Sequence, residues 1–343
     1  MPVFGDAPSE STTRRWRHVF PTALLLPIAG CAGAQSSLDP AGTEADLVAT
    51  LFWAMTGGGA LIWLFVVGFS VFVTKIRPSA YSDAAGVHLI VWGGCVFPVV
   101  VLGFLVWFGT AAMPDLRRAS DGPRIAVSGE RFWWRIAYDV EGEPGVARSL
   151  PKGGVASANE LYLPLGRRSE ILLGSPDVIH SFWVPAIAGK TDTIPGRVNR
   201  LVLEPTRAGT FNGICAEFCG TAHAEMGFRV IVLPEADYLA RVAAEAGPAA
   251  LTAHPGRDLF LAHGCGACHA VRGTEAAGTV GPDLTHLAAR RTLGAGILPM
   301  DEASIARFVR DPGAVKQGAT MPPFRHLPEA EIATIAAWLG RLR

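Results

Sequence analysis

The chain has 343 residues, half of them hydrophobic, and carries 30 basic against 30 acidic side chains. This balance lacks the basic excess that supports binding to nucleic acid, so we expect no nucleic-acid partner. The mean hydropathy of +0.30 is high for a water-soluble protein and the length allows two or three domains, which together predict a membrane-anchored multidomain protein.

Residues 1–30 have the features of a secretory signal peptide. Three arginines, at positions 14, 15 and 17, precede the apolar run 19–28. The run ends in Ile-Ala-Gly-Cys31, which resembles a bacterial lipobox and predicts a lipid on Cys31, the N-terminus of the mature chain. Cleavage as a plain signal peptide, with Cys31 unmodified, is the alternative.

Residues 47–75 and 87–113 are predicted to form a two-helix transmembrane hairpin, which occupies 47–113. Each range contains 27 consecutive residues without a formal charge, more than the roughly 20 that span a bilayer. Lys75 and Arg77 lie between the two spans and belong in the cytoplasm by the positive-inside rule. The remainder of the chain is then expected outside.

Between residues 120 and 234 the pattern changes to short apolar or alternating segments separated by Gly, Pro and Asp. The predicted strands are 124–127, 132–138, 160–164, 168–173, 198–204 and 228–233. Short strands in this number indicate an all-β sandwich or barrel.

Two thiols, an imidazole and a thioether fall within twelve residues, at Cys215, Cys219, His223 and Met226. Sulfur with imidazole suits copper better than magnesium or calcium. A disulfide between the two cysteines, or a zinc site that includes His223, is the alternative. Either would leave Met226 unused, since zinc seldom takes a thioether. A second imidazole, His180, lies 35 residues before Cys215 in a strand-like run.

Residues 235–250 are rich in Ala and Glu and predict a short helix or stiff linker. In the last domain, residues 251–343, Cys265-Gly-Ala-Cys268-His269 is the attachment motif of c-type haem: two thiols bond to the porphyrin and the imidazole ligates iron. Met321, in Gly-Ala-Thr-Met-Pro-Pro, is the predicted sixth ligand, and Met300 is its rival.

Helical runs flank this motif. One is 256–262, and the other, 329–339, closes the chain with Ile332, Ile335, Ala336 and Leu339 on one face. The histidines at 254, 263, 286 and 326 are taken to be surface residues.

Together these motifs resemble subunit II of the haem-copper cytochrome c oxidases, in the caa3 type that carries a fused cytochrome c domain. The pattern His…Cys-x-Glu-x-Cys-x-x-x-His-x-x-Met is that of the family's binuclear copper centre, CuA. The resemblance implies an all-β cupredoxin-like domain at 120–234 and an all-α class I cytochrome c domain at 251–343.

The resemblance also implies a role for each copper ligand. Cys215 and Cys219 would bridge both coppers, and His180 and His223 would each bind one of them. Two bridging thiolates on a rigid loop share the unpaired electron, so little rearranges when an electron enters or leaves.

The remaining residues of the motif would complete the centre. Met226 would be a weak ligand of one copper, and Glu217 would bind the other through its backbone carbonyl, with its carboxylate facing a magnesium ion shared with subunit I. Phe132, Trp133 and Trp134 match an aromatic cluster through which electrons enter in the family, although the first position is usually Trp. A plain aromatic core is the other interpretation.

By resemblance the protein is the electron-input subunit of an enzyme, a haem-copper terminal oxidase. Electrons would pass from cytochrome c or a bc1 complex through haem c and CuA to haem a of subunit I. Subunit I, with haem a3 and CuB, would reduce oxygen to water and translocate protons, and subunit III would be a further partner. The copper and haem domains would lie on the periplasmic side of the bacterial inner membrane.

Other functions share parts of this pattern. A CuA and haem c subunit of a nitric oxide reductase would look similar, whereas a quinol oxidase subunit would lack the copper ligands. A copper-delivery or assembly lipoprotein would not need a haem domain. Residues 120–234 hold 12 basic and 12 acidic side chains, without the acidic surplus that steers a soluble basic cytochrome, which agrees with a tethered donor.

Overall fold

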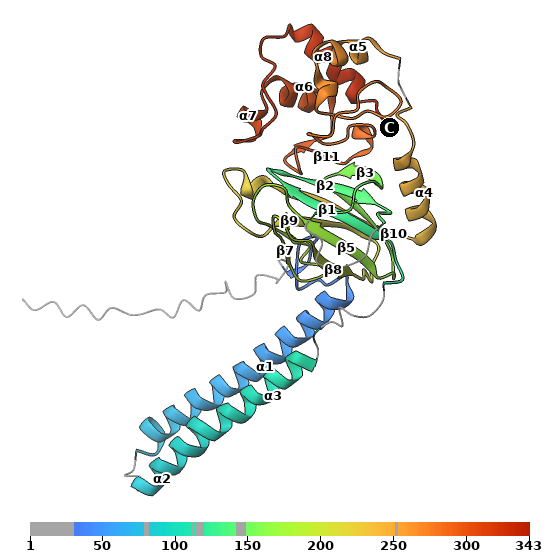
Figure 1. Cartoon of the computed structure of the whole chain (residues 1–343). Coiled ribbons are helices and arrows are strands. Elements are labelled where there is room, and N and C mark those ends of the chain that lie inside the picture. The colour runs from blue at the N-terminus through green and yellow to red at the C-terminus, as the bar shows by residue number, and fades with distance from the viewer. Residues whose placement is uncertain (1–30, 79–81, 112, 114–119, 142–148, 251–252) are drawn as a thin grey trace, which may run out of the picture.

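The computed structural model describes residues 31–78, 82–111, 113, 120–141, 149–250 and 253–343. Three units follow one another: a helical hairpin, a β domain and a domain of short helices (Figure 1). The β domain lies between the other two. The predicted signal peptide lies outside the described residues, whereas Cys31 is their first member.

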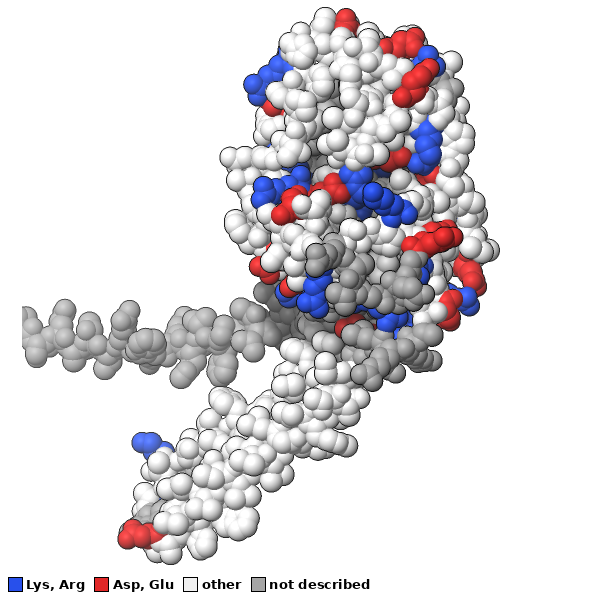
Figure 2. Space-filling view, in the orientation of Figure 1, with Lys and Arg blue, Asp and Glu red and all other residues white. Residues whose placement is uncertain are grey.

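Two long apolar helices form the hairpin, as the sequence predicts. The first is α1 (Thr43–Val71), prolonged by the π-helical η3 (Phe72–Ile76); the second combines α2 (Asp83–His88), π-helical η4 (Leu89–Val96) and α3 (Phe97–Ala111). Both are long and apolar enough to cross a membrane, and they leave their apolar side chains exposed. Figure 2 shows the shaft of the hairpin free of charge on this face, with charged side chains at its far tip and over the other two domains.

Both helices begin before the predicted ranges. The prediction counted only uncharged residues, whereas the first turn of each helix contains acidic side chains. Glu44 and Asp46 occupy the first turn of α1, where a negative charge meets the positive end of the helix dipole. The second helix begins at Asp83, and the Ser82 hydroxyl caps it by accepting from Ala85 N at 3.3 Å. Among the described residues α3 ends at Ala111, and the predicted range ends at 113.

The segment before α1 is joined to the β domain by backbone hydrogen bonds. Ala41 N donates to Ala186 O at 2.6 Å, Thr43 N to Glu204 O at 3.0 Å and Asn212 N to Ala34 O at 2.8 Å. At Gly42 this segment passes so close to the β domain that a Cβ would lie 2.3 Å from Ile187 O, which only glycine avoids.

Two five-stranded sheets face one another in the β domain, which confirms the cupredoxin-like sandwich. One sheet has the order β3-β2-β1-β5-β8 and the other β4-β10-β9-β6-β7. The strands are β1 (Arg124–Glu130), β2 (Trp133–Tyr138), β3 (Val155–Ala158), β4 (Glu160–Pro164), β5 (Ser169–Gly174), β6 (His180–Trp183), β7 (Thr191–Thr193), β8 (Asn199–Leu203), β9 (Gly209–Cys215) and β10 (Gly227–Leu233).

Alternation along the strands builds the sandwich core. In β2 every second residue is buried, so Trp134, Ile136 and Tyr138 face the opposite sheet. Trp134 meets the stacked rings of Phe182 and Phe228, whose centroids are 4.6 Å apart. These three rings, of Trp134, Phe182 and Phe228, lie directly beneath the loop that joins β9 to β10.

The predicted linker is a helix packed on the sandwich. α4 (Glu235–Ala246) inserts Tyr238 and Val242 into the core of the β domain. It runs along the side of the β domain toward the third domain (Figure 1). The chain therefore leaves the sandwich along an anchored element.

The last domain has a core of its own, built on helices. Its elements are α5 (Pro255–Ala262), η6 (Cys265–Ala267), η7 (Leu287–Ala289), β11 (Thr292–Leu293), β12 (Leu298–Pro299), α6 (Glu302–Arg310), α7 (Pro312–Val315) and α8 (Glu329–Leu339). The apolar face predicted for α8 is buried, and Phe260 of α5 packs edge-on against Trp338 of α8 with centroids 5.2 Å apart. A Cβ on Gly256 would lie 2.4 Å from Thr334 O, so glycine permits this close helix crossing.

Candidate copper and haem centres

The sulfur-rich residues lie on the copper loop, residues 216–226, and at the end of the strand before it. Strands β6 and β9 are antiparallel neighbours with Phe182 opposite Cys215, which brings His180 to the base of the loop. Cys215 N donates to Met226 O at 3.1 Å and so closes the loop. Trp134 Nε1 reaches the same carbonyl at 3.4 Å from below.

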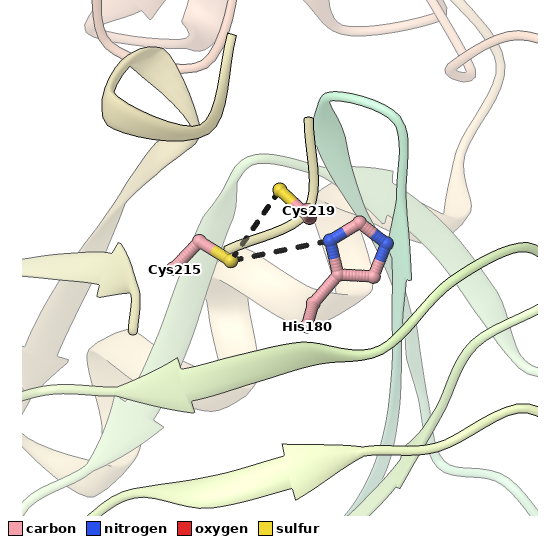
Figure 3. A group of neighbouring side chains, drawn as sticks. All are labelled: His180, Cys215 and Cys219. Atoms are coloured by element: carbon pink, nitrogen blue, oxygen red, sulfur yellow. Dashed lines mark hydrogen bonds between the residues drawn. The ribbon is translucent and has the colours of Figure 1, made fainter. Parts of the chain in front are cut away.

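Five donor atoms form a chain of close neighbours. Cys215 Sγ lies 3.9 Å from His180 Nδ1 and 3.8 Å from Cys219 Sγ. Cys219 Sγ in turn lies 3.6 Å from His223 Nδ1 and 3.9 Å from Met226 Sδ. Figure 3 shows His180 and both thiols pointing toward one another. Each imidazole therefore lies beside a different thiol.

This arrangement fits a metal better than a disulfide. The two sulfurs are 3.8 Å apart, far beyond the roughly 2.05 Å of a disulfide bond. Metal bonds of about 2.0–2.3 Å from sulfur and nitrogen would place neighbouring ligand atoms at about the separations seen here. The Glu217 carbonyl also points inward, since it accepts from Cys215 Sγ at 3.2 Å. Two thiols, two imidazoles and a thioether are a donor set suited to copper.

The two thiols differ in acidity. Burial opposes the ionisation of Cys215, but hydrogen bonds to His180 and to backbone groups outweigh it, so its pKa falls to about 7. Burial, with the neighbouring Cys215 sulfur, raises the pKa of Cys219 to about 12. The pair therefore loses its first proton more easily than its second, and the positive charge of a bound metal would favour loss of both.

The haem motif begins at a short helical turn, with Cys265 on η6 and Cys268 just after it. His269 Nδ1 donates to Pro282 O at 2.8 Å, which leaves Nε2 without the proton. Burial lowers the pKa of His269 and keeps the imidazole neutral. A Cβ on Gly281 would lie 2.5 Å from His269 Cε1, so the glycine cradles the ring. These residues fit a c-type haem.

Both candidate sixth ligands pack against the core of the haem domain. Met321 and Met300 are half-buried there, so burial alone does not separate them. Met321 follows Gln317 and Gly318, which lie against the copper loop.

The three aromatic residues at 132–134 lie in different surroundings. Trp134 is part of the sandwich core, and Trp133 lies under the Arg135 guanidinium, 4.6 Å from its ring centroid. Phe132 is buried between two glycines: a Cβ on Gly220 would lie 3.0 Å from its ring, and one on Gly318 would lie 3.1 Å from it. Its ring thus touches the copper loop and the haem domain.

Two further residues at the sites were missed in the sequence analysis. The Asp177 carboxylate lies 2.9 Å from His180 Nε2, and its place three residues before the histidine was the available signal. Lys316 is buried and contacts both domains. The prediction of a surface position was wrong for His286, which is buried and bonds Gly247 O at 3.1 Å because the packed end of α4 covers it.

Comparisons with known proteins match both the β domain and the last domain. Residues 147–233 match the family "Cytochrome C oxidase subunit II, periplasmic domain", and residues 253–343 match "Cytochrome c". A cytochrome c oxidase subunit 2 of Alkalihalophilus pseudofirmus is 31% identical over 93% of this chain and 95% of its own length. That of Bacillus subtilis is 26% identical over 96% of this chain and 98% of its own.

Among solved structures, the periplasmic domain of subunit II of the cytochrome oxidase of Bradyrhizobium japonicum is 29% identical. It covers 37% of this chain and 95% of its own length, with a TM-score of 0.31. The match to the Alkalihalophilus protein extends over nearly the whole of both chains. From that match and from the two domains found side by side, the chain belongs to the cytochrome c oxidase subunit II family, in its caa3-type fusion with cytochrome c.

Proposed function

We propose that this chain is the electron-input subunit of a haem-copper terminal oxidase. It takes electrons from an external donor at the cytochrome c domain and delivers them through the copper loop to haem a of subunit I. Subunit I reduces oxygen to water and translocates protons. The observation that carries the proposal is that both donor sets lie on one chain with their loops in contact: Thr221 Oγ1 donates to Gln317 O at 3.0 Å.

The haem domain supplies the first set of ligands. Haem c and binuclear copper, when bound, each accept and release single electrons. We assign Cys265 and Cys268 to the covalent attachment of haem, and His269 and Met321 to its axial positions. The Pro282 carbonyl orients His269 so that Nε2 is available to iron. His/Met ligation raises the potential of a haem, which suits a carrier that feeds copper.

The copper loop and the two strands beside it supply the second set. Cys219, His223, Met226 and the Glu217 carbonyl would come from the loop, Cys215 from the end of β9 and His180 from β6. The two thiols would be shared by both coppers, and Met226 would be a weak ligand. The sulfur ligands and His180 are buried, so water is excluded around them. The backbone bond between Cys215 and Met226 restrains the loop, and little movement on gaining an electron favours rapid transfer.

The exposed face of the copper loop is the proposed contact with subunit I. Phe218 exposes 77% of its surface there, and the Glu217 side chain beside it is also exposed. An exposed aromatic next to a carboxylate suits a protein interface that also holds a cation. We propose that the Glu217 carboxylate binds a magnesium ion at that border. Electrons would reach the loop on its other side, past Phe132.

The proposed location is the bacterial inner membrane, which the hairpin crosses twice. Lys75 and Arg77 would lie in the cytoplasm and both redox domains in the periplasm. A lipid on Cys31 would add a third anchor. Subunits I and III are the proposed partners within the enzyme, and cytochrome c or a bc1 complex is the proposed donor.

The test is spectroscopy on the purified complex containing wild-type chain or Cys219→Ser. The wild type should show a mixed-valence copper EPR signal beside low-spin haem c, and the variant should lose only the copper signal. A folded, copper-loaded wild type without mixed valence contradicts the proposal. Co-purification with a multi-span haem subunit that consumes oxygen excludes the nitric oxide reductase and copper-delivery alternatives.

A further inference from the structure

Lys316 follows α7 and is almost fully buried, with 4% of its surface exposed. Its ammonium donates to three backbone carbonyls: Phe132 O at 2.8 Å, Glu225 O at 2.9 Å and Gly294 O at 2.8 Å. An ammonium has three N–H donors, so these bonds use all of them. Gly294 belongs to the haem domain, whereas Phe132 and Glu225 belong to the β domain.

Burying a lysine ammonium costs free energy unless hydrogen bonds or an opposite charge compensate it, so the partners of Lys316 determine whether this position is stable. Here the partners are carbonyl oxygens from two domains. Removing the ammonium would leave three buried carbonyls without this donor, and two of them are on the far side of the interface. Lys316 therefore acts as a clasp: its bonds to Phe132 O and Glu225 O exist only while the domains are docked, and its bond to Gly294 O holds the ammonium in place within the haem domain.

The clasp lies where the two candidate centres approach. Glu225 directly precedes Met226 on the copper loop, and Lys316 begins the haem loop, residues 316–321, which ends in Met321. Within that loop Gly318 adopts φ +84°, and a Cβ there would lie 2.3 Å from Thr221 Oγ1. The haem loop thus lies directly on the copper loop.

Further hydrogen bonds to backbone groups hold the same pair of domains. Gly227 N donates to Ala295 O at 3.1 Å, and Arg135 Nη2 reaches Val280 O at 3.2 Å, just before the glycine that cradles His269. The Glu160 carboxylate accepts from Arg291 N. Each domain also has its own hydrophobic core, so loss of the clasp should loosen docking without unfolding either domain.

We propose that Lys316 is a positioning residue that fixes the haem loop on the copper loop, so that electrons cross between the domains in one docked geometry. This inference rests on the proposed function for the identity of the two centres. With both groups bound, loss of one electron by the haem would be balanced by gain of one electron at the copper centre. Lys316 exchanges neither electrons nor protons.

The experiment compares wild type, Lys316→Met and the control Lys152→Met, whose side chain is exposed on the β domain, each in the purified oxidase. Hydrogen exchange should become at least about tenfold faster in Lys316→Met at Gly227 and Arg291, whose amides bond across the interface. Flash-induced electron transfer from haem c to copper should slow by at least about tenfold, since small displacements of reacting groups are costly. The optical and EPR spectra of both centres should stay as in wild type.

Gly318→Ala provides a second variant that acts by a different route, because its Cβ would press on Thr221 and Phe132. It should show the same two changes. If exchange or electron transfer in both variants stays within about twofold of the control, Lys316 does not position the haem loop. A wild type that lacks haem c or mixed-valence copper would instead contradict the proposed function, and the exchange measurement would still report on docking.

Discussion

Nε2 of His180 lies 2.9 Å from Oδ1 of Asp177, on the side of the imidazole opposite Cys215. The carboxylate itself is held by the backbone N–H groups of Arg131 at 2.8 Å and Val178 at 2.6 Å. Burial opposes its ionisation, but these bonds and the one to His180 keep the Asp177 pKa below its usual range. Asp177 thus fixes the tautomer that leaves Nδ1 free for a metal.

Asp177→Asn should weaken copper binding by about 10–100-fold, because the amide holds the ring and its proton less firmly. Competition between the protein and a copper chelator measures this affinity. Asp139→Asn is the matched control: Asp139 is exposed, and its φ of +54° suits asparagine. Equal copper retention by the two variants would show that Asp177 does not support the site.

Tyr138→Phe should lower the free energy of unfolding by about 1–3 kcal/mol, because it removes a buried hydrogen-bond acceptor. The hydroxyl accepts from Tyr162 N at 2.9 Å and donates to Glu160 O at 3.2 Å. Tyr238→Phe is the control, since within the described residues the buried Tyr238 hydroxyl has no hydrogen-bond partner. Chemical unfolding of the two variants should differ; equal loss of stability would contradict this account.

Glu160→Gln should change how stability depends on pH. Burial raises the pKa of Glu160, although the bond from Arg291 N opposes the shift. The folded state then binds more protons than the unfolded state above the unfolded pKa of roughly 4.3, so the wild-type free energy of unfolding falls as pH rises through the folded pKa.

Glutamine cannot ionise, so this part of the fall should be missing from Glu160→Gln. Thermal unfolding at a series of pH values from about 4 to 7 measures the difference from wild type. Glu275→Gln, at an exposed position, should keep the wild-type profile. A difference between Glu160→Gln and wild type that grows below pH 4 rather than above it would reverse the predicted sign.

Gly281→Ala should disturb His269, the proposed axial ligand of the haem, while the proposed thioether bonds at Cys265 and Cys268 still form. The new Cβ would lie 2.5 Å from Cε1 and 2.8 Å from Nδ1 of His269, which displaces the ring from Pro282 O. We expect a shifted Soret band and a lower haem potential. Gly313→Ala adds a methyl group where the nearest atom is 3.8 Å away, and its spectrum should match wild type.

The sequence predicts most reliably what is local. The hairpin and the buried face of α8 follow from runs and periods within one segment. Most donors of the copper loop also lie within twelve residues of one another. Strand β9 was missed because two glycines interrupt its alternation; a Cβ on one of them, Gly213, would lie 2.1 Å from the Phe228 ring.

Long-range contacts account for what the sequence does not predict. His180 reaches Cys215 through the pairing of β6 with β9, so its place beside the thiols follows from the resemblance and not from spacing. Lys316 binds backbone carbonyls, which every residue has, so no side-chain pattern marks its partners. The role of Asp177 is partly predictable from the sequence: a carboxylate three residues before a histidine is a local signal, but a common one.

The backbone bonds between the segment before α1 and the β domain determine how high the copper loop stands above the membrane. They join residues 34, 41 and 43 to three separate parts of the sandwich, and α1 begins within this joint. Because these bonds join the start of α1 to the sandwich, we expect a tilt of the first apolar helix to carry the sandwich with it. Lengthening the chain at Gly42 should change the height of the copper loop above the hairpin, even with every proposed ligand intact.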